Sequence, residues 1–513
     1  METKKITKLL YILAFIKLVI PFFLQNSFYQ PHRDEYLYLA EGHHMAWGFM
    51  EIPPLLSVFA WLTNLFGDGM FWIKIWPALF GAFTFILVGK MVISLGGKTF
   101  ALILAWIPFI LSGYMRLFFL FQPNFLEVFF YVLITYSLFQ YFQSQQNKWL
   151  YVFGIAAGLG MMSKYSVAFY ILSILVALLF THWRKLYTNK HFYFAALIAL
   201  IIFLPNIIWQ YNHRFPVIFH MNELQDEQLK FIGYKDFLTG QLLMNLLSIF
   251  TWFAGLYFLL FTKKGKPFRT FGFAYFFVIF LLMVLHGKNY YALGVYPMLF
   301  AFGGFQLEKA TMHHLKWTRY AMIIFSVSLG LYALPLTMPL AKPDDLVRYY
   351  QFSHLNKTGD FTWEDHLQHP LPQDFADMIG WKEIAEKAAT AYHNLSAEAQ
   401  KETMVFCDGY YTAGALNYYR KAFNLPETYS TSASFLLWMP DTFHIKNILL
   451  VAKNLPDDQP VVQQFGKISI VDSVSIPLFR ETGTKIILLE NAHDHANEFL
   501  TGAVKKLKGE FRR

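Results

Sequence analysis

The sequence has little cysteine and little charge. Its one cysteine, Cys407, excludes an intrachain disulfide and provides no cysteine-rich metal or redox motif. Only 15% of the residues are charged, whereas a soluble protein has about 25%. The hydrophobic residues, 56% of the chain, occur in long blocks. This composition indicates a multi-pass membrane protein with an additional polar region.

Several motifs that would indicate other functions are absent. The sequence contains neither GxGxxG nor a P-loop, so it has no recognisable cradle for a soluble nucleotide. It has no HExxH motif, and the adjacent His43 and His44 are poorly spaced to bind one metal ion. We therefore expect no metal site and no required cofactor, although the sequence is compatible with a divalent cation. The net charge is +9, and the Lys and Arg residues lie in short loops between apolar blocks. This distribution argues against a nucleic-acid partner.

Eleven apolar segments are candidates for membrane-spanning helices. A span needs about 20 apolar residues, and shorter ones are tolerated within a bundle. The apolar run after the basic residues 1–8 lacks a small-residue cleavage site, so we interpret it as the first span and not as a signal peptide. The segments are 9–28, 71–93, 100–114, 123–142, 149–162, 166–181, 192–209, 237–261, 268–285, 290–305 and 317–336.

The distribution of Lys and Arg predicts the orientation of the chain. Basic residues concentrate at the N-terminus and in the loops around 98, 184–190, 263–269 and 309–319. Because loops rich in Lys and Arg remain in the cytoplasm, we predict a cytoplasmic N-terminus. With eleven spans, the first loop and the C-terminal region would both face outward.

The composition becomes more polar from residue 338 onward. Segments 404–407, 447–452, 468–471 and 485–489 have the pattern of short buried strands, and 381–393, 412–423 and 495–507 that of helices. Strands that alternate with helices indicate a small α/β domain. We therefore predict a membrane domain over 1–337, with an outer loop at 29–70, and a soluble domain over 338–513.

The outer loop concentrates chemically active groups. Arg33, Asp34 and Glu35 are adjacent there, and segments 36–47 and 54–66 have the spacing expected of helices in the membrane interface. A carboxylate at this depth can act as a general base toward a hydroxyl group. The alternative is a solvated acidic pair held by Arg33, because charges near the interface cost less than charges at the membrane centre.

Glu127 is a carboxylate within an apolar helix. It lies three residues after Asn124, so the two side chains share one helix face. A charged residue in a membrane helix costs a few kcal/mol and by default suggests a functional site. The alternative is a structural hydrogen bond to a neighbouring helix.

Several basic residues lie near the predicted outer surface, which is otherwise poor in positive charge. They are Arg116, Lys164 and Lys288, and His286 is close to Lys288. Such a group suggests an anionic ligand, for which a phosphate is the natural candidate. Each base could instead extend toward lipid headgroups.

Motifs in a fixed order along the chain resemble one protein family. They are RDE and HHMAWGFMEIPPL in the outer loop, then PNFLE, GLGMMSKYS, PNIIWQYNHRFPVI and KNYYALGVYPMLFAFGG, with CDGYYTAGALNYY and FLLWMP in the polar region. The chain resembles the bacterial branch of the dolichyl-phosphate-mannose protein mannosyltransferase family, glycosyltransferase family 39. This family includes the aminoarabinose transferases that modify lipid A.

The resemblance implies a fold, a location and a reaction. The fold would be GT-C, a mainly α polytopic membrane protein with about 11 transmembrane helices and a C-terminal soluble α/β domain. The protein would lie in the bacterial inner membrane, with its active site on the periplasmic face. It would move a sugar, with inversion, from a polyprenyl-phosphate carrier to a glycolipid, polysaccharide or protein acceptor.

The resemblance also assigns site residues. The first-loop acid of the family corresponds to Asp34, with Glu35 beside it. The second acid corresponds to Glu127, where the family pattern has Asp, and the base that holds the carrier phosphate corresponds to Lys288. The expected catalytic residues are Asp34, Glu35 and Glu127, and the expected substrate-binding residues are Arg33, Asn124, Lys164, His286, Lys288, Tyr290 and Tyr291.

Two functions of other classes compete with glycosyl transfer. A transporter or flippase of a lipid-linked sugar needs polar residues along a path through the bilayer and often has two related halves. This sequence has its polar residues near one face and no visible halves. A non-catalytic assembly protein would have no need of the two acids and the outer lysines. We therefore expect an enzyme.

Overall fold

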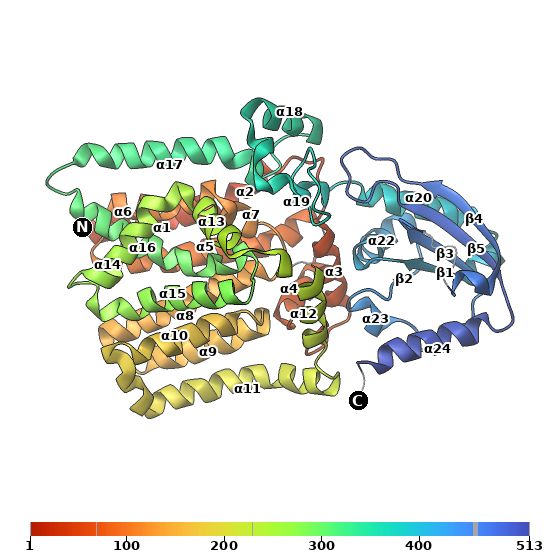
Figure 1. Cartoon of the computed structure of the whole chain (residues 1–513), viewed down its shortest axis with the longest axis horizontal. Helices are drawn as coiled ribbons and strands as arrows, with labels where there is room; N and C mark the ends of the chain where they lie inside the picture. The colour runs from red at the N-terminus through yellow and green to blue at the C-terminus, as the bar shows by residue number, and fades with distance from the viewer. Residues whose placement is uncertain (1, 68, 228, 455–459, 512–513) are drawn as a thin grey trace.

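The chain forms a bundle of helices followed by a smaller part built on a five-stranded sheet (Figure 1). The structure is a computed structural model that describes residues 2–67, 69–227, 229–454 and 460–511. The sheet and its helices lie against one end of the bundle, and the N-terminus lies at the other end (Figure 1).

Most helices of the bundle run along its long axis (Figure 1). The α-helices are α1 (Glu2–Val19), α2 (Pro21–Leu24), α3 (Arg33–His43), α4 (Leu55–Leu65), α5 (Met70–Leu95), α6 (Thr99–Leu111), α7 (Gly113–Leu117), α8 (Asn124–Ser144), α9 (Lys148–Ser163), α10 (Val167–Leu179), α11 (Lys190–Asn212), α12 (Pro216–Glu227), α13 (Tyr234–Met244), α14 (Ile249–Phe261), α15 (Arg269–Val284), α16 (Tyr296–Ala310) and α17 (Lys316–Thr337). Short 3-10 helices connect them: η1 (His182–Thr188), η2 (Leu229–Phe231), η3 (Leu246–Ser248), η4 (Lys266–Phe268) and η5 (Asn289–Val295).

The bundle belongs to a multi-pass membrane protein. In the part of the chain that the structure describes, six helices are long and apolar enough to cross a membrane, or eight if two bent pairs each form one span. On α11, Leu197, Leu200 and Ile201 are exposed, and this apolar surface is one that lipid would cover. The six helices are Thr3–Leu24, Met70–Leu95, Asn124–Ser144, Lys190–Asn212, Lys266–Val284 and Lys316–Thr337.

Each of the eleven predicted apolar segments coincides with a helix or with consecutive helices. The number of eleven spans is not confirmed. Three of the helices concerned, α6, α9 and α16, have only 13, 16 and 15 residues. At 1.5 Å per residue, helices of this length are shorter than the hydrocarbon core of about 30 Å.

The outer loop contains the two predicted helices, α3 and α4. With α12 they lie at the junction between the bundle and the sheet (Figure 1). The first begins at Arg33 and ends at His43, so it starts and ends earlier than the predicted 36–47. A Cβ atom added at Gly42 would lie 2.7 Å from the backbone of Ala60, so the absence of a side chain lets α3 and α4 touch.

The polar part of the chain mixes helices with a sheet. Its helices are α18 (Pro343–Ser353), η6 (Leu355–Lys357), η7 (Gly359–Phe361), α19 (Gln373–Ala376), α20 (Trp381–His393), α21 (Ala397–Lys401), α22 (Tyr410–Phe423), α23 (Phe435–Trp438), η8 (Val462–Gln464) and α24 (Ala496–Gly509). Its strands are β1 (Thr403–Cys407), β2 (Thr428–Tyr429), β3 (Asn447–Ala452), β4 (Phe465–Ser473) and β5 (Lys485–Ala492).

The sheet has the strand order β2-β1-β3-β5-β4. Strand β1 is parallel to both β2 and β3, whereas β5 is antiparallel to β3 and β4. The four predicted strands and three predicted helices are all present. Strand β2 was not predicted, since two residues are too few to give a periodic pattern.

Helix α3 is part of the hydrophobic core of the polar part. Its Tyr36 is fully buried and packs edge to face on Trp381, with ring centroids 5.8 Å apart. A Cβ atom added at Gly414 of α22 would lie 2.9 Å from the backbone of Tyr36, so this glycine permits close packing. The outer loop is therefore fixed from both sides, by the bundle and by the sheet region.

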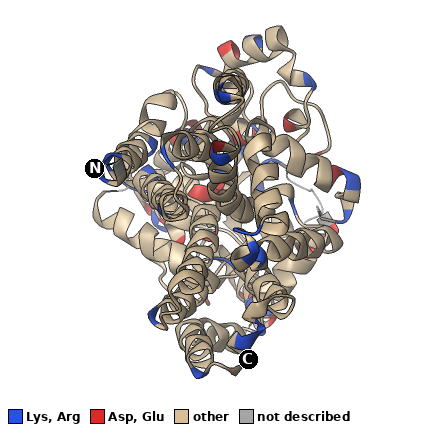
Figure 2. Cartoon of the chain, turned by 90° about the vertical axis from the view of Figure 1, so that its left-hand side faces the viewer, with Lys and Arg blue, Asp and Glu red and all other residues tan. Residues whose placement is uncertain are grey.

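Charge is distributed unevenly between the two ends of the bundle. Figure 2 shows the end that carries the N-terminus, where Lys and Arg predominate over Asp and Glu in the foreground. Helices α3 and α12, which contain Asp34, Glu35, Glu41, Glu223 and Asp226, instead lie at the junction with the sheet (Figure 1).

Candidate active site

Helix α3 begins at the junction between the bundle and the sheet region, and its first turn contains two acids. His32 caps the helix, because its Nδ1 accepts a 3.2 Å hydrogen bond from the backbone N–H of Asp34. Glu35 completes a capping box by accepting a 2.8 Å hydrogen bond from the backbone N–H of His32. Acids in the first turn also interact favourably with the helix dipole.

Glu35 is fully buried and all its contacts are structural. Lys74 of α5 donates to both of its carboxylate oxygens, at 2.6 and 2.7 Å. The backbone N–H of Phe121 donates to the same carboxylate at 2.5 Å. The predicted catalytic pair is therefore divided: Glu35 connects α3 to the bundle, and Asp34 faces elsewhere.

Asp34 is the acid that remains accessible, with 30% of its side chain exposed. Tyr410, at the start of α22, donates a 2.8 Å hydrogen bond to its Oδ1, and Gln122 donates a 3.2 Å hydrogen bond to its Oδ2. Arg33 Nε lies 3.6 Å from Oδ1. The sheet region thus supplies a direct partner to the carboxylate of the first loop.

The predicted second acid, Glu127, is buried at the start of α8. Lys164 donates a 2.8 Å hydrogen bond to its Oε2, and Ser166 donates one of 2.5 Å to its Oε1. Lys164 also donates to Asn124 Oδ1 at 2.7 Å. The predicted residues Asn124, Glu127 and Lys164 are therefore in one hydrogen-bonded group.

Gln122 joins this group to Asp34. Asn124 donates a 3.3 Å hydrogen bond to the side-chain oxygen of Gln122, whose amide nitrogen donates to Asp34. A continuous chain of hydrogen bonds therefore runs from Asp34 through Gln122 and Asn124 to Lys164 and Glu127. The tertiary structure brings together residues from the outer loop, α8 and the end of α9.

Two predicted tyrosines cover Lys164. Its Nζ lies 4.5 Å from the ring centroid of Tyr291 and 5.5 Å from that of Tyr290, which is within cation–π range. The side chain of Lys164 is 15% exposed. The two rings therefore limit the approach of water to the lysine.

Lys288 and His286 precede these tyrosines but differ in their surroundings. Lys288 is 24% exposed, and its Nζ is 3.8 Å from Glu364, outside hydrogen-bond distance. His286 instead stacks on Tyr234 and has its Nδ1 2.8 Å from the backbone oxygen of Ile232. No contact between His286 and the Asp34 group is found in the described part of the chain.

A second charged group surrounds the first turn of α3 and combines Arg116 of α7 with side chains of the polar part. Arg116 forms a 2.9 Å ion pair with Asp374, and Arg480 forms ion pairs with Asp377 at 3.1 Å and with Glu364 at 2.8 Å. His32 Nε2 is 3.8 Å from a carboxylate oxygen of both aspartates.

The electrostatic environment affects these acids differently. Burial raises the pKa of Asp34, but the charges of His32 and Arg33 and the Tyr410 hydrogen bond lower it more, so the pKa lies below its ordinary value. Burial raises the pKa of Asp377 to about 6, despite the opposing charges of Arg33 and His32. Asp34 is therefore a carboxylate at neutral pH.

No metal-binding arrangement was found among residues 2–67, 69–227, 229–454 and 460–511. Within these ranges no group of three or more His, Cys, Asp or Glu side chains could hold a metal ion.

Several residues of the site were not predicted from the sequence. Gln122 and Tyr410 lie beside or within motifs that carried the family resemblance, QPNFLE and CDGYYTAG, so a signal was present for both. Asp377, Glu364 and Arg480 lie in loops of ordinary polar composition. Nothing in their local sequence distinguishes them from solvated charges.

Comparisons with known proteins give one family match and two similar folds. Residues 51–209 match the family model described as dolichyl-phosphate-mannose-protein mannosyltransferase. No curated protein matches the sequence. Among solved structures, ArnT from Cupriavidus metallidurans bound to undecaprenyl phosphate is similar, with a TM-score of 0.60 and 13% identity over 94% of this chain and 97% of that one. Its apo state gives a TM-score of 0.57 and 12% identity, with the same coverage.

These similarities extend over nearly the whole fold, although the sequence identity is low. The matched segment 51–209 contains Glu127 and Lys164, and the ArnT fold covers the bundle and the polar part alike. The chain is therefore a multi-pass membrane protein of the GT-C glycosyltransferase fold, and its expected resemblance to the dolichyl-phosphate-mannose protein mannosyltransferase family is confirmed.

Proposed function

We propose that this protein is a membrane glycosyltransferase that moves a sugar from a polyprenyl-phosphate carrier to an acceptor, with inversion at the anomeric carbon. The reaction would take place at the outer, periplasmic face of a bacterial inner membrane. The similar ArnT structure contains undecaprenyl phosphate, which supports a carrier of this class. The acceptor is a glycolipid, a polysaccharide or a protein.

The observation that carries the proposal is the contrast between Asp34 and the two other predicted acids, Glu35 and Glu127. Glu35 and Glu127 are buried and each is paired with a lysine, whereas Asp34 is partly exposed and has no lysine partner among the described residues. It is also connected to Lys164 through Gln122 and Asn124. An accessible carboxylate linked to a group of bases suits a reaction between a hydroxyl group and a phosphate ester.

Asp34 would receive and orient the acceptor hydroxyl group. The oxygen of this group attacks the anomeric carbon from the face opposite the phosphate, and the new glycosidic bond forms as the bond to the phosphate oxygen breaks. The electron pair leaves with the polyprenyl phosphate, and the acceptor proton passes to Asp34. Because the pKa of Asp34 lies below its ordinary value, positioning and charge stabilisation contribute more than its strength as a base.

Lys288 would bind the carrier phosphate. Its Nζ lies 3.8 Å from the carboxylate of Glu364, whereas Arg116 and Arg480 make closer ion pairs of 2.8–3.1 Å. Lys288 is therefore held less tightly by protein groups than these arginines are. Lys164 donates two hydrogen bonds to protein groups and has a third N–H to offer. Both lysines would stabilise the negative charge that develops on the leaving phosphate.

Glu127 and Glu35 would act through their partners. Glu127 positions Lys164, and Glu35 holds the start of α3 against α5 through Lys74. In this proposal, Asp34 alone of the three predicted acids contacts the reacting atoms.

The arrangement of the chain supports the proposed topology. The N-terminus lies at the end of the bundle remote from α3 and the sheet (Figure 1), and that end is rich in Lys and Arg (Figure 2). A cytoplasmic N-terminus would place the outer loop and the soluble domain, residues 338–513, on the opposite side of the membrane.

A release assay tests the function. The protein in nanodiscs would be supplied with a set of polyprenyl-phosphate sugars, and free polyprenyl phosphate would be measured for wild type and for Asp34→Asn. We expect release by wild type and a loss of at least about 100-fold in Asp34→Asn, the scale typical of a positioned acid–base group. A thermal unfolding measurement checks that the variant remains folded.

Two results would contradict the proposal. Equal release by the two proteins would remove Asp34 from the chemistry. Absence of release from every donor, with membrane extracts added as acceptor, would argue against transfer; movement of the same lipids across liposome membranes would then identify a flippase.

A further inference from the structure

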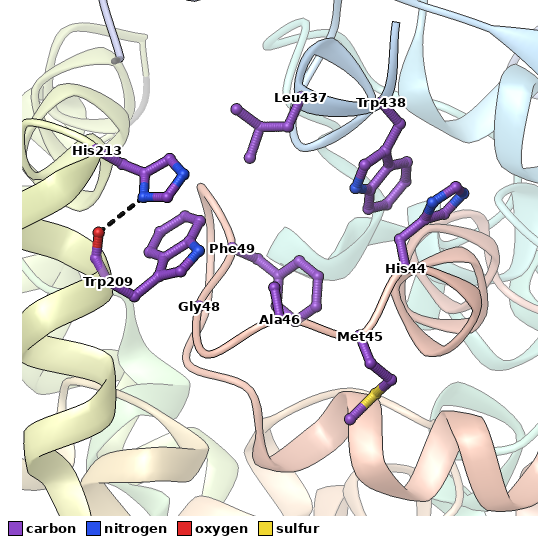
Figure 3. Close-up of a pocket in the computed structure, with 9 residues that line it drawn as sticks. All are labelled: His44, Met45, Ala46, Gly48, Phe49, Trp209, His213, Leu437 and Trp438. Carbon is purple, nitrogen blue, oxygen red and sulfur yellow. Dashed lines mark hydrogen bonds between the residues drawn. The ribbon is translucent and has the colours of Figure 1, made fainter. Parts of the chain in front are cut away.

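A cavity of about 330 Å³ lies at the end of α3 opposite to Asp34 (Figure 3). Three distant parts of the chain line it. The loop after α3 provides His44 and Phe49. The last turn of α11 provides Trp209, and His213 follows the end of this helix. Helix α23 provides Trp438. The volume of the cavity lies within the range of small-molecule sites, about 300–1,000 Å³.

Two tryptophan–histidine stacks face each other across the cavity. Trp209 and His213 stack on one side, with ring centroids 4.0 Å apart and planes 18° apart. His44 and Trp438 stack on the other side, at 4.2 Å and 12°. Figure 3 shows the two pairs on opposite sides of the open space. Each imidazole supports one face of its tryptophan, so the indole rings are held in fixed orientations.

The indole nitrogens provide polar groups that the protein does not use. In Figure 3 the indole nitrogens of Trp209 and Trp438 point toward the space between the two rings. Neither N–H donates a hydrogen bond to another group in the described part of the chain, and both tryptophans are only partly buried, so these donors are open to a ligand. The cavity therefore presents two aromatic rings and two free donors.

The cavity carries no charged side chain. None of its nine lining residues is Asp, Glu, Lys or Arg. Burial lowers the pKa of His44, so this imidazole is neutral at pH 7. A neutral ligand that has hydroxyl groups and a flat aliphatic face matches these properties, whereas a phosphate would find no cation.

The position of Trp209 is fixed by close packing between α11 and the loop after α3. A Cβ atom added at Gly48 would lie 2.4 Å from the Trp209 ring, so only glycine fits at this position. Asn206, one turn before Trp209, donates a 2.8 Å hydrogen bond to the backbone oxygen of Trp47. The loop and α11 are therefore locked together where the cavity forms.

We propose that this cavity binds a sugar ring of the acceptor, as a subsite separate from the reaction centre. The C–H groups of a sugar face would pack on the electron-rich indole ring, and its hydroxyl groups would accept hydrogen bonds from the two indole N–H groups. Sugar binding stands on the geometry of the cavity alone, but its assignment to the acceptor rests on the proposed transferase function.

The position of the cavity limits the acceptor. His44 directly follows α3 and lies ten positions after Asp34, which corresponds to about 15 Å along the helix axis. A ring bound in the cavity cannot itself present the attacking hydroxyl group at the reaction centre. The acceptor therefore contains several sugar rings and extends from the cavity to Asp34.

Saturation-transfer NMR on the full-length protein in nanodiscs tests sugar binding without any donor. The probes are the methyl glycosides of glucose, galactose, mannose and N-acetylglucosamine, with undecaprenol as an apolar probe. We expect transfer to the ring protons of at least one glycoside. Trp438→Ala should weaken its binding about three- to tenfold, the range for one aromatic contact.

Matched variants separate the cavity from other surfaces. Trp438→Phe keeps an aromatic ring but lacks the N–H, so it should lose part of the binding and should fold as wild type does. Trp317→Ala removes an exposed tryptophan on α17 and should bind the glycoside unchanged. Asp34→Asn should also bind it unchanged, because the reaction centre is separate.

The outcomes are distinct for the two proposals. Lack of transfer to every glycoside, or equal binding by Trp438→Ala, would overturn the sugar site. Transfer to undecaprenol alone would assign the cavity to a lipid chain. Glycoside binding by a protein that releases no polyprenyl phosphate would retain the sugar site but overturn the transferase function and, with it, the acceptor assignment.

Discussion

The hydroxyl group of Tyr410 donates a 2.8 Å hydrogen bond to the carboxylate of Asp34, and the two residues are 376 positions apart in the sequence. The same hydroxyl accepts a 3.1 Å hydrogen bond from Arg33. The start of α22 is therefore part of the candidate active site.

Removal of this hydrogen bond should change the pH dependence of the reaction. The Tyr410 hydrogen bond is one of the contributions that lower the pKa of Asp34, so Tyr410→Phe should raise that pKa toward its ordinary value. The acidic limb of the kcat/KM profile for release should then move to higher pH. Tyr429→Phe, which alters a tyrosine of the edge strand β2, is the control. An unchanged profile in Tyr410→Phe would contradict a role of Asp34 as an ionised group.

The two adjacent acids should respond differently to neutral substitution. Glu35→Gln leaves Lys74 buried without a counter-charge, and breaking such a pair costs about 3–5 kcal/mol. Asp34→Asn alters a partly exposed side chain, so its unfolding free energy should change by only about 1 kcal/mol. Chemical unfolding in detergent measures both. Equal destabilisation by the two substitutions would contradict the assignment of Glu35 to structure and Asp34 to chemistry.

The Glu127–Lys164 pair predicts a non-additive double mutant. Each single change, Glu127→Gln or Lys164→Met, leaves one buried group without its partner and should destabilise the protein by a few kcal/mol. The double variant should be more stable than the sum of the two effects predicts, because neither charge remains. Release should be lost in all three variants. Additive losses of stability would show that the two side chains do not interact.

Lys288 is expected to affect donor binding. Lys288→Met should raise the KM for the polyprenyl-phosphate sugar about tenfold or more, since a hydrogen bond to a charged group contributes about 1.5–3 kcal/mol. Initial rates at a series of donor concentrations measure this. Lys309→Met, at the far end of α16, is the control for a general loss of positive charge. An unchanged KM in Lys288→Met would place the phosphate elsewhere.

Asp377 should make stability depend on pH between about 4 and 6. Burial raises its pKa from the ordinary 3.8 to about 6, so the folded protein holds this proton more tightly than the unfolded chain. This contribution to stability is present below pH 4 and is lost as the pH rises through 6, and a shift of about two pKa units corresponds to roughly 3 kcal/mol.

The variant Asp377→Asn isolates this contribution. It retains the backbone oxygen that accepts from Arg33 and Trp381, but it cannot titrate. The decline in unfolding temperature between pH 4 and 6 should therefore be smaller in Asp377→Asn than in wild type. The same decline in both proteins would assign it to another group.

The sequence by itself determined the class of the protein and most of its elements. Long apolar blocks require helices in a membrane, because only internal hydrogen bonds satisfy the backbone in lipid. The predicted strands and helices of the polar part follow from local periodicity, and their positions are confirmed. Ordered motifs also indicated the family and singled out Asp34, Glu127 and Lys164 as candidate site residues.

Only the tertiary structure decided which groups these residues contact. Asp34 and Glu35 are neighbours in the sequence, yet α3 directs one toward Tyr410 and the other toward Lys74. Local patterns cannot show such partners, since helix packing brings them together from distant segments. The ion pairs of Asp377 and Arg480 and the two tryptophan–histidine stacks depend on the same long-range packing, for which the sequence holds no periodic signal.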